Sequence, residues 1–370
     1  MNSIAHAPTP DNVIVGVDTH SQIHVAVAIT GLGARLGEFS FDPDPAGFAL
    51  LEDWAAAHGT VAAWGIEGTA SYGAGLARHL IRGGELVLEV NRPDRSLRRR
   101  VGKSDPIDAE AAARAVLAGT ATAIPKTGDG LVESMRVTRL VKASALKART
   151  QAINQLKALI ITAPDALRGE LDGLTRTRLI DRCAASRPAT NNDPATTTKR
   201  ALRTLARRIQ TLTVEIKELH AQLAVLVAAV APTLLDQFGV GPDTPAARLV
   251  AAGDNADRLH SEAAFAALCG TNPVPASSGN TDHHRLNRGG DRQANAALHR
   301  IIIVRLAWDP ETRAYMADRV TPNGSNKKHI IRKLKRHLAR RLYPHITAIV
   351  APAPAHGGPT TEPHHDELAA

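Results

Sequence analysis

The sequence has few cysteines, few aromatic residues and no long apolar run. Cys183 and Cys269 are its only cysteines and form no CxxC pair, which excludes a disulfide framework and a cysteine zinc site. Aromatic residues make up 3% of the chain, which argues against an aromatic-rich β-sandwich. No apolar stretch reaches the length of a bilayer span, and the N-terminus lacks a signal-peptide pattern. We therefore expect a soluble, cytoplasmic protein.

The charge is unbalanced towards the basic side. Lys and Arg total 45 against 36 Asp and Glu, a formal net charge of +9. Such an excess attracts polyanions over long distances, so nucleic acid is the first partner to consider. The length of 370 residues suggests two or three compact units, and a hydrophobic content of 44% allows real cores. Abundant alanine favours closely packed helices, so we expect an α/β region together with helical regions.

The first third of the chain predicts a mixed sheet. Residues 13–30 contain two β-branched runs around a polar turn, and residues 34–41 alternate in the same way. An amphipathic helix is then expected at 45–58, a strand at 61–68, a helix at 72–82 and a strand at 85–90. This order, βββαβαβα, is the order of an RNase H-like domain, with helices on the faces of the sheet.

The remaining two thirds predict mostly helices. Residues 105–118 form an alanine-rich helix, while 131–161 and 200–229 have the apolar stripes of two long helices that pair as a coiled-coil-like hairpin. The Ser, Thr, Asn and Pro-rich residues 186–199 indicate a linker, and residues 231–345 indicate mostly short helices joined by Gly and Pro turns. We therefore predict a disordered N-terminus (1–11), an RNase H-like domain (12–125), a helical middle (126–230), a mainly helical C-terminal domain (231–345) and a disordered tail (346–370).

Four carboxylates form a candidate metal site. Asp18 and Glu67 end two predicted buried strands, while Asp105 and Asp108 lie three residues apart at the start of a helix and so point the same way. Four oxygen donors suit Mg²⁺ or Mn²⁺, and two such ions can promote phosphodiester transfer. Taken alone, the pair of aspartates is better explained as helix capping, with Asp105 as the N-cap before Pro106 and Asp108 as an acidic residue in the first turn. Asp18 alone could equally be a solvated turn residue, and Glu67 a charge at a strand end. The joint pattern favours the metal site.

Two basic segments are candidate nucleic-acid contacts. The first precedes the paired aspartates and comprises Arg92, Arg95, Arg98, Arg99, Arg100 and Lys103. The second is a predicted amphipathic helix whose cations include Lys327, Lys328, Arg332, Lys333, Lys335, Arg336 and Arg340. The alternative for this helix is an ordinary solvated surface.

Four blocks of the sequence resemble the DEDD transposases of bacterial insertion sequences. The blocks are GVDTHSQIHVAVAI, GIEGTASYGAGLARHL, NRPDRSLRRRVGKSDPIDAEAAARA and GTNPVPASSGNTDHHRLNRGGDRQANAALHRI, and the similarity covers roughly residues 12–345. The resemblance implies a RuvC-like N-terminal domain, a C-terminal transposase domain, and site-specific recombination of donor and target DNA. It places the four family carboxylates on Asp18, Glu67, Asp105 and Asp108.

The same resemblance implies a serine nucleophile and a guide RNA. In this family a serine before a glycine is the nucleophile, which points to Ser278, with Ser277 beside it. Without the resemblance, these serines would be a polar turn after Pro275. Members of the family also use a bridge RNA that pairs with target and donor DNA. The long middle helices and the exchange of strands suggest a dimer or tetramer.

Three other functions compete with this one. GVDTHSQ is similar to the first phosphate loop of actin-like sugar kinases, although Thr19 and His20 stand where a small residue is expected and no second loop occurs. A structure-selective nuclease resembling Holliday-junction resolvases would need the carboxylates but not Ser278. A non-catalytic nucleic-acid-binding protein would need only the basic helix.

Overall fold

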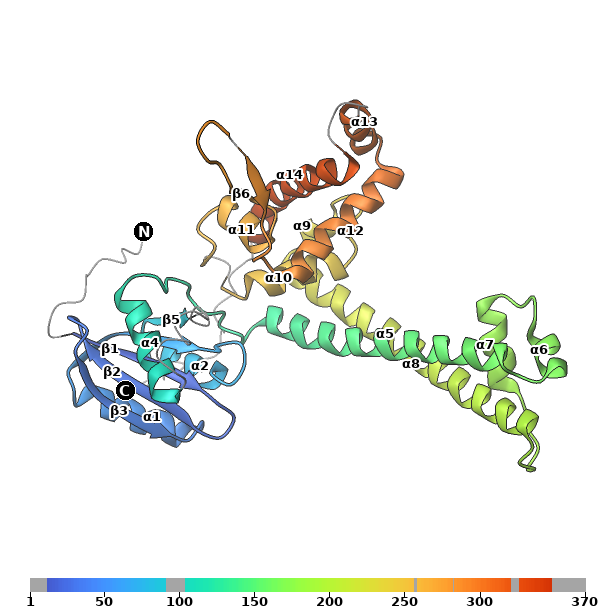
Figure 1. Cartoon of the computed structure of the whole chain (residues 1–370), viewed down its shortest axis with the longest axis horizontal. Helices are drawn as coiled ribbons and strands as arrows, with labels where there is room; N and C mark the ends of the chain where they lie inside the picture. The colour runs from blue at the N-terminus through green and yellow to red at the C-terminus, as the bar shows by residue number, and fades with distance from the viewer. Residues whose placement is uncertain (1–11, 91–103, 256–257, 282, 321–325, 348–370) are drawn as a thin grey trace, which may run out of the picture.

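The protein has three parts, which Figure 1 shows as a sheet with helices, a long helical arm and a mainly helical C-terminal part. The structure is a computed structural model that describes residues 12–90, 104–255, 258–281, 283–320 and 326–347. Among the helices in these ranges, none combines the length and the apolar character that a bilayer span would require.

The described part of the N-terminal region forms a mixed sheet of five strands with the order β3-β2-β1-β4-β5. The strands are β1 (Asn12–Thr19), β2 (His24–Thr30), β3 (Arg35–Phe41), β4 (Thr60–Glu67) and β5 (Val87–Val90). Strands β1, β2 and β3 are antiparallel neighbours, whereas β4 runs parallel to both β1 and β5. The central strand β1 is buried almost throughout because both faces of the sheet are covered. The predicted mixed sheet and the predicted order of its elements are confirmed.

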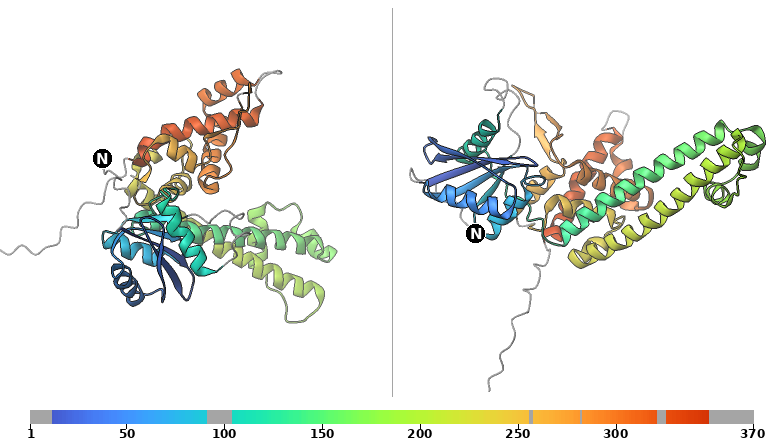
Figure 2. Two further views of the ribbon diagram at one scale, coloured as in Figure 1. Left: turned by 60° about the vertical axis from the view of Figure 1, so that its left-hand side comes forward. Right: turned by 90° about the horizontal axis from the view of Figure 1, so that it is seen from below.

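Helices cover both faces of this sheet (Figure 2). Helices α1 (Pro45–Ala56) and α2 (Ala74–Arg82) pack on one face, where Trp64 and Leu51 are fully or almost fully buried. Helix α4 (Asp105–Leu117) packs on the other face against β1 and β2. Alternation along each strand therefore decides which side chains face α4.

The arm is built from two long helices that pack against each other along their length (Figures 1 and 2). They are α5 (Leu131–Ile161) and α8 (Pro194–Val230), and the short helices α6 (Asp165–Leu171) and α7 (Arg176–Ala185) close the far end. The connection between α7 and α8 ends at Asp193, so α8 begins six residues before the predicted start at residue 200. The side chain of Asp193 accepts a hydrogen bond from the amide of Thr196 at 3.0 Å, and this cap together with Pro194 starts the helix early.

The C-terminal part contains six described helices and a β-hairpin. The helices are α9 (Pro232–Leu235), α10 (Asp243–Ala252), α11 (Glu262–Leu268), α12 (Arg292–Trp308), α13 (Pro310–Arg319) and α14 (Lys327–Thr347), and the hairpin strands are β6 (Pro273–Pro275) and β7 (His284–Leu286). The expectation of mostly short helices was wrong for α12 and α14 and omitted the hairpin. Its strands have only three residues each, and β6 contains two prolines, so no alternation of apolar and polar residues could indicate them in the sequence. Helix α14 also runs two residues past the predicted boundary at 345, and Ile346 is buried.

The base of the arm is anchored in the C-terminal part. Met135 of α5 and Val227 of α8 belong to its hydrophobic core. The carboxylate of Asp254 accepts hydrogen bonds from the amides of Val132 at 2.8 Å and Glu133 at 3.2 Å, and so caps the start of α5 from a distant part of the chain. The arm and the C-terminal part therefore form one packed body.

Candidate active site

Two glycines allow α4 to lie unusually close to the sheet. A methyl group on Gly16 of β1 would stand 2.0 Å from the carbonyl oxygen of Ala109, and one on Gly65 of β4 would stand 2.9 Å from that of Ala112. Both distances are shorter than real contacts, so only glycine fits at these positions. The alanines on the facing side of α4 complete the close fit.

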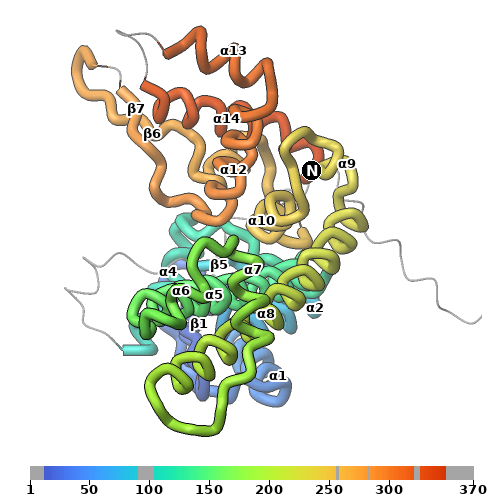
Figure 3. The backbone as a smooth tube through the Cα atoms, turned by 90° about the vertical axis from the view of Figure 1, so that its right-hand side faces the viewer, coloured from blue at the N-terminus to red at the C-terminus, as the bar shows by residue number. Residues whose placement is uncertain are grey.

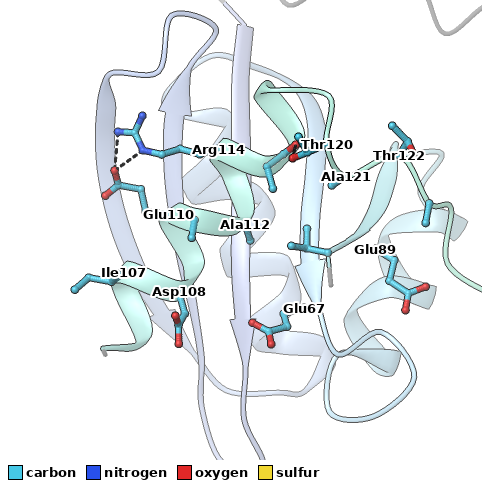
Figure 4. A pocket seen from close by; sticks show the side chains of 14 residues that line it. Glu67, Glu89, Ile107, Asp108, Glu110, Ala112, Arg114, Thr120, Ala121 and Thr122 are labelled. Carbon is cyan, nitrogen blue, oxygen red and sulfur yellow. Dashed lines mark hydrogen bonds and ion pairs between the residues drawn. The ribbon is translucent and has the colours of Figure 1, made fainter. Parts of the chain in front are cut away.

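This close approach determines where four carboxylates lie. Strand alternation places Asp18 on the same face as Gly16, and Glu67 on the same face as Gly65, which is the face that α4 covers. The two carboxylates end neighbouring parallel strands, because Val17 pairs with Ile66 one residue earlier. Helix α4 begins at this edge with Asp105 and carries Asp108 one turn later. Figure 4 shows Asp108 and Glu67 directed towards the same space.

Local hydrogen bonds hold the ends of the two strands together. The hydroxyl of Thr19 donates to the carbonyl oxygen of Glu67 at 2.8 Å, across β1 and β4. The amide of His20 donates to Nδ1 of His24 at 3.3 Å, which fixes the turn between β1 and β2. Asp18 and Asp108 are buried, and Asp105 is partly exposed. Carboxylates with limited access to water and fixed backbones are typical of cation sites.

His20 is a site residue that the sequence argument did not include. Its Nε2 lies 3.2 Å from Oδ2 of Asp18 and 3.3 Å from Oδ1 of Asp105, so it links the strand to the helix. One ligand atom from each of these three residues lies within 4.8 Å of the other two. In the sequence, His20 is notable only as a mismatch to the phosphate loop of actin-like sugar kinases. Its position two residues after Asp18, in a turn that returns to the same edge, is the signal that could have included it.

The surroundings of Asp18 disfavour its ionised form. Burial raises the pKa of its carboxyl group above the ordinary value, and the nearby negative charges of Asp108 and Asp105 raise it further. His20 acts in the opposite direction through its charge and its hydrogen bond. Several carboxylates with limited access to water stay ionised together only if positive charge lies nearby. A bound divalent cation would supply that charge. The donor set, mostly hard oxygens with one imidazole, fits such a cation.

A cavity of about 640 Å³ adjoins the carboxylates. Glu67 and Asp108 are among the residues that line it, and the alanines of α4 together with residues 120–123 make up half of them. Glu110, another acidic residue of the wall, accepts a hydrogen bond from Nε of Arg114 at 2.9 Å, as Figure 4 shows. No residue of the C-terminal part lines this cavity within the described ranges.

The start of α4 differs from the simple capping alternative. Ser104, with an extended backbone, is the N-cap, and Asp105 is the first helical residue. The interpretation of Asp105 as the N-cap is therefore wrong. Asp105 directs its carboxylate to His20 instead.

The candidate nucleophile lies elsewhere, in the loop of the β6–β7 hairpin. Ser278 and Thr281 exchange backbone hydrogen bonds of 3.2 and 3.1 Å, and Gly279 between them has a φ of +55°. The hydroxyl of Ser277 accepts from the amide of His283 at 3.1 Å, whereas that of Ser278 contacts no partner among the described residues and is exposed. The structure thus brings Asp18 and Asp105 together around His20, with Glu67 and Asp108 on the wall of the adjoining cavity, and it places the serine hairpin (residues 273–286) apart from them (Figure 1).

The predicted basic contacts fall into two groups. Arg92, Arg95, Arg98, Arg99, Arg100 and Lys103 lie outside the described residues. On α14, Lys327, Lys328, Arg332 and Lys333 are exposed. The other three make contacts within the chain: Lys335 donates to Asn295 at 2.8 Å, and Arg336 and Arg340 lie beside Glu262.

Two known protein families match parts of this chain. Residues 15–163 match a DEDD family described as transposase, and residues 231–317 match the transposase IS116/IS110/IS902 family. The chain belongs to the IS110-type family of DEDD transposases. It is therefore an enzyme that cuts and joins DNA, and its family implies the use of a divalent metal. A search of curated proteins finds no match.

The two matches follow the parts of the structure. The first runs from within β1 to the end of α5, and so contains all four carboxylates. The second runs from the start of α9 to residue 317 within α13 and contains the serine hairpin, but it does not reach α14. Assignment to this family decides against the sugar-kinase alternative.

Proposed function

We propose that this transposase moves an insertion sequence by site-specific recombination, with a divalent-metal site in the sheet region and a serine nucleophile in the hairpin. The proposal takes the sheet region, residues 12–125, as an RNase H-like domain of the RuvC type, followed by a helical middle (126–230) and a transposase domain (231–345). The observation that carries it is the cluster of Asp18 from β1, Asp105 from α4 and His20 at one edge of the sheet, where Glu67 of β4 and Asp108 line the adjoining cavity.

Asp18, Glu67, Asp105 and Asp108 are the proposed ligands of Mg²⁺ or Mn²⁺, and His20 adds a nitrogen donor. A bound divalent ion would polarise a phosphoryl oxygen and offset the negative charge that develops during strand cleavage. The chain's own part is to hold the ligands in place. Strand β1 orients Asp18, the Thr19 hydroxyl keeps the two strand ends in register, and the close fit of α4 sets the position of Asp108.

Ser278 is the proposed nucleophile. Its hydroxyl oxygen would attack the phosphorus, forming a serine–phosphate bond while the bond from phosphorus to one deoxyribose oxygen breaks. The serine proton passes to a base, and the departing deoxyribose oxygen takes up a proton. One ester replaces another, so the bond energy is kept for rejoining. Ser277 is the weaker candidate because its hydroxyl already bridges the hairpin to His283.

The separation of the two sites supports an oligomeric enzyme. Because no described residue of the C-terminal part lines the carboxylate cavity, Ser278 meets the carboxylates only if the parts move or a second copy supplies one of them. We propose a dimer or tetramer that holds donor and target DNA together. A bridge RNA is the proposed guide, and the exposed cations of α14 suit its backbone as well as that of DNA.

The test is trapping of a covalent protein–DNA adduct. Wild-type protein incubated with the ends of its own element, its RNA and Mg²⁺ should form an adduct that denaturing electrophoresis resolves. We expect Ser278→Ala to abolish the adduct and Ser277→Ala to retain it at a reduced level. DNA cleavage that persists in Ser278→Ala without any adduct would instead support the alternative, a structure-selective metal-dependent nuclease.

A further inference from the structure

A basic pocket lies at the base of the serine hairpin. It has a volume of about 430 Å³ and is formed where β7 runs beside the first half of α14, an arrangement that Figure 3 shows. Its polar walls come from both elements and define what we name the hairpin pocket, comprising His284, Arg285, His329, Arg332, Lys333 and Arg336.

The pocket holds several positive charges, of which the described part of the chain pairs only that of Arg336 with a carboxylate. None of its lining residues is acidic. Nη2 of Arg336 donates a hydrogen bond to the carboxylate of Glu262 in α11 at 2.9 Å, and this contact fixes the position of Arg336. Arg285, Arg332 and Lys333 are exposed, and no described residue forms an ion pair with them. Several cations around one concavity favour a polyanion over a surface that only needs solubility.

The hairpin relates this pocket to Ser278. Residues 273–275 and 284–286 pair as strands beside the pocket, and Ser278 lies three residues beyond Pro275. At about 3.3 Å per residue, Ser278 lies on the order of 10 Å from Pro275, which pairs with His284 of the pocket, and this distance corresponds to about three steps along one DNA strand. A phosphate held in the pocket and a phosphate at Ser278 can therefore belong to one strand.

We propose that the hairpin pocket binds a backbone phosphate of the DNA strand that Ser278 attacks, a few nucleotides from the scissile phosphate. The inference rests on the proposed function, because it takes Ser278 as the nucleophile. The pocket and the serine share one hairpin, so binding the strand also positions the loop. An exposed two-stranded hairpin that is only marginally rigid by itself gains a defined place from this contact.

Binding measurements test the pocket separately from catalysis. We would use the Ser278→Ala protein with a metal chelator, a fluorescent mixed-sequence DNA duplex and an RNA of the same sequence. The pocket variant is Arg332→Gln with Lys333→Gln, and the matched control is Lys147→Gln with Lys157→Gln, which removes the same charge from exposed positions of α5 outside the pocket. Thermal denaturation checks that both remain folded.

We expect the pocket variant to bind DNA about tenfold more weakly and to lose about two from the slope of log affinity against log salt, with a clearly smaller change in the control. Equal losses in the two variants would overturn the proposal, because the cations would then act only through net charge. A loss for RNA without a loss for DNA would also overturn it and assign the pocket to the RNA.

Cross-linking gives a second readout. Cys183 and Cys269 are both buried, so a cysteine introduced by Lys333→Cys is the accessible thiol among the described residues. By thiol–disulfide exchange it should cross-link to DNA whose tether, on a phosphate near the cleavage position, ends in a mixed disulfide with a small thiol that is released, and Lys147→Cys should not. If wild-type protein forms the serine adduct while Lys333→Cys cross-links nowhere, the pocket is wrong and the proposed function stands. If no adduct forms at all, the proposed function itself fails.

Discussion

The carboxylate site and the serine hairpin represent opposite ways of positioning a reactive group. The carboxylates lie where a helix packs so closely on a sheet that a methyl group on Gly16 would overlap the helix backbone. The serine lies in an exposed loop, where a methyl group on Gly279 would meet nothing within 4 Å. The first site is therefore held by the core of its domain, whereas the second depends on what the hairpin contacts.

This difference has consequences for motion. Regions with few buried apolar contacts open at low free-energy cost, while sites built into a core move only when the core does. A cation site needs ligands that are already in place, since moving charged ligands together costs energy. A nucleophile that must reach DNA, and later release it, is better carried by an adjustable element.

Removing one negative charge from the packed site should nearly abolish cleavage. Asp18→Asn keeps the shape of the side chain but loses an ionised ligand at the end of β1, so we expect cleavage to fall by about 10³-fold, or roughly 4 kcal/mol of transition-state stabilisation. Salt-dependent DNA binding should remain. Asp53→Asn, an exposed position on α1 in the same region, is the matched control. Undiminished cleavage by Asp18→Asn would reject the metal site.

Adding a methyl group should distinguish the two regions directly. Gly16→Ala should destabilise the protein by about 3 kcal/mol and shift α4, because the methyl group meets backbone atoms that cannot turn aside. Gly279→Ala has open space and should cost only about 1 kcal/mol, from its positive φ. Thermal denaturation measures both, and Gly75→Ala in α2, with only ordinary contacts, is the control. Similar losses at positions 16 and 279 would contradict the contrast.

Removing the imidazole should weaken the site without destroying it. His20→Ala leaves the four carboxylates, so we expect the affinity for Mn²⁺ to fall by about 10- to 100-fold, as when groups around a metal are removed. Electron paramagnetic resonance during a titration with Mn²⁺ measures this affinity. Labelling histidine with ¹⁵N should alter the spectrum of the bound ion in wild type but not in His20→Ala. His58→Ala, after α1, serves as the control. An unchanged affinity would leave His20 as a link between Asp18 and Asp105 alone.

The smallest effect is a pH dependence of stability. Burial and two neighbouring carboxylates raise the pKa of Asp18, so the folded protein binds this proton more tightly than the unfolded chain. The resulting stabilisation is complete below the unfolded pKa and is lost as pH rises through the raised one. Without metal, Tm of wild type should therefore decline more than Tm of Asp18→Asn as the pH rises from the unfolded pKa of Asp18 through its raised pKa in the folded protein. Mg²⁺ at neutral pH should raise Tm of wild type more than that of the variant. Parallel curves would mean that Asp18 is not perturbed.

Much of the sheet region could be predicted because its signals are local. The valines of β1 and the buried run of β4 have the composition of covered strands, and a polar residue at the end of each one is visible in the sequence. The early start of α8 could also have been found, from Asp193 and Pro194. The hairpin could not, because strands of three residues carry too few positions for a periodicity.

The sequence by itself determined the order of the sheet elements, the placement of Asp18 and Glu67 at strand ends, and the pairing of Asp105 with Asp108 on one helical turn. These depend on periodicities of two and 3.6 residues, which act between near neighbours. Only the tertiary structure decided that His20 joins Asp18 and Asp105, that Gly16 and Gly65 allow α4 to pack closely, and that Arg285 and the cations of α14 line one pocket. Contacts between segments far apart in the chain depend on how closely whole elements pack, and no local pattern encodes that distance.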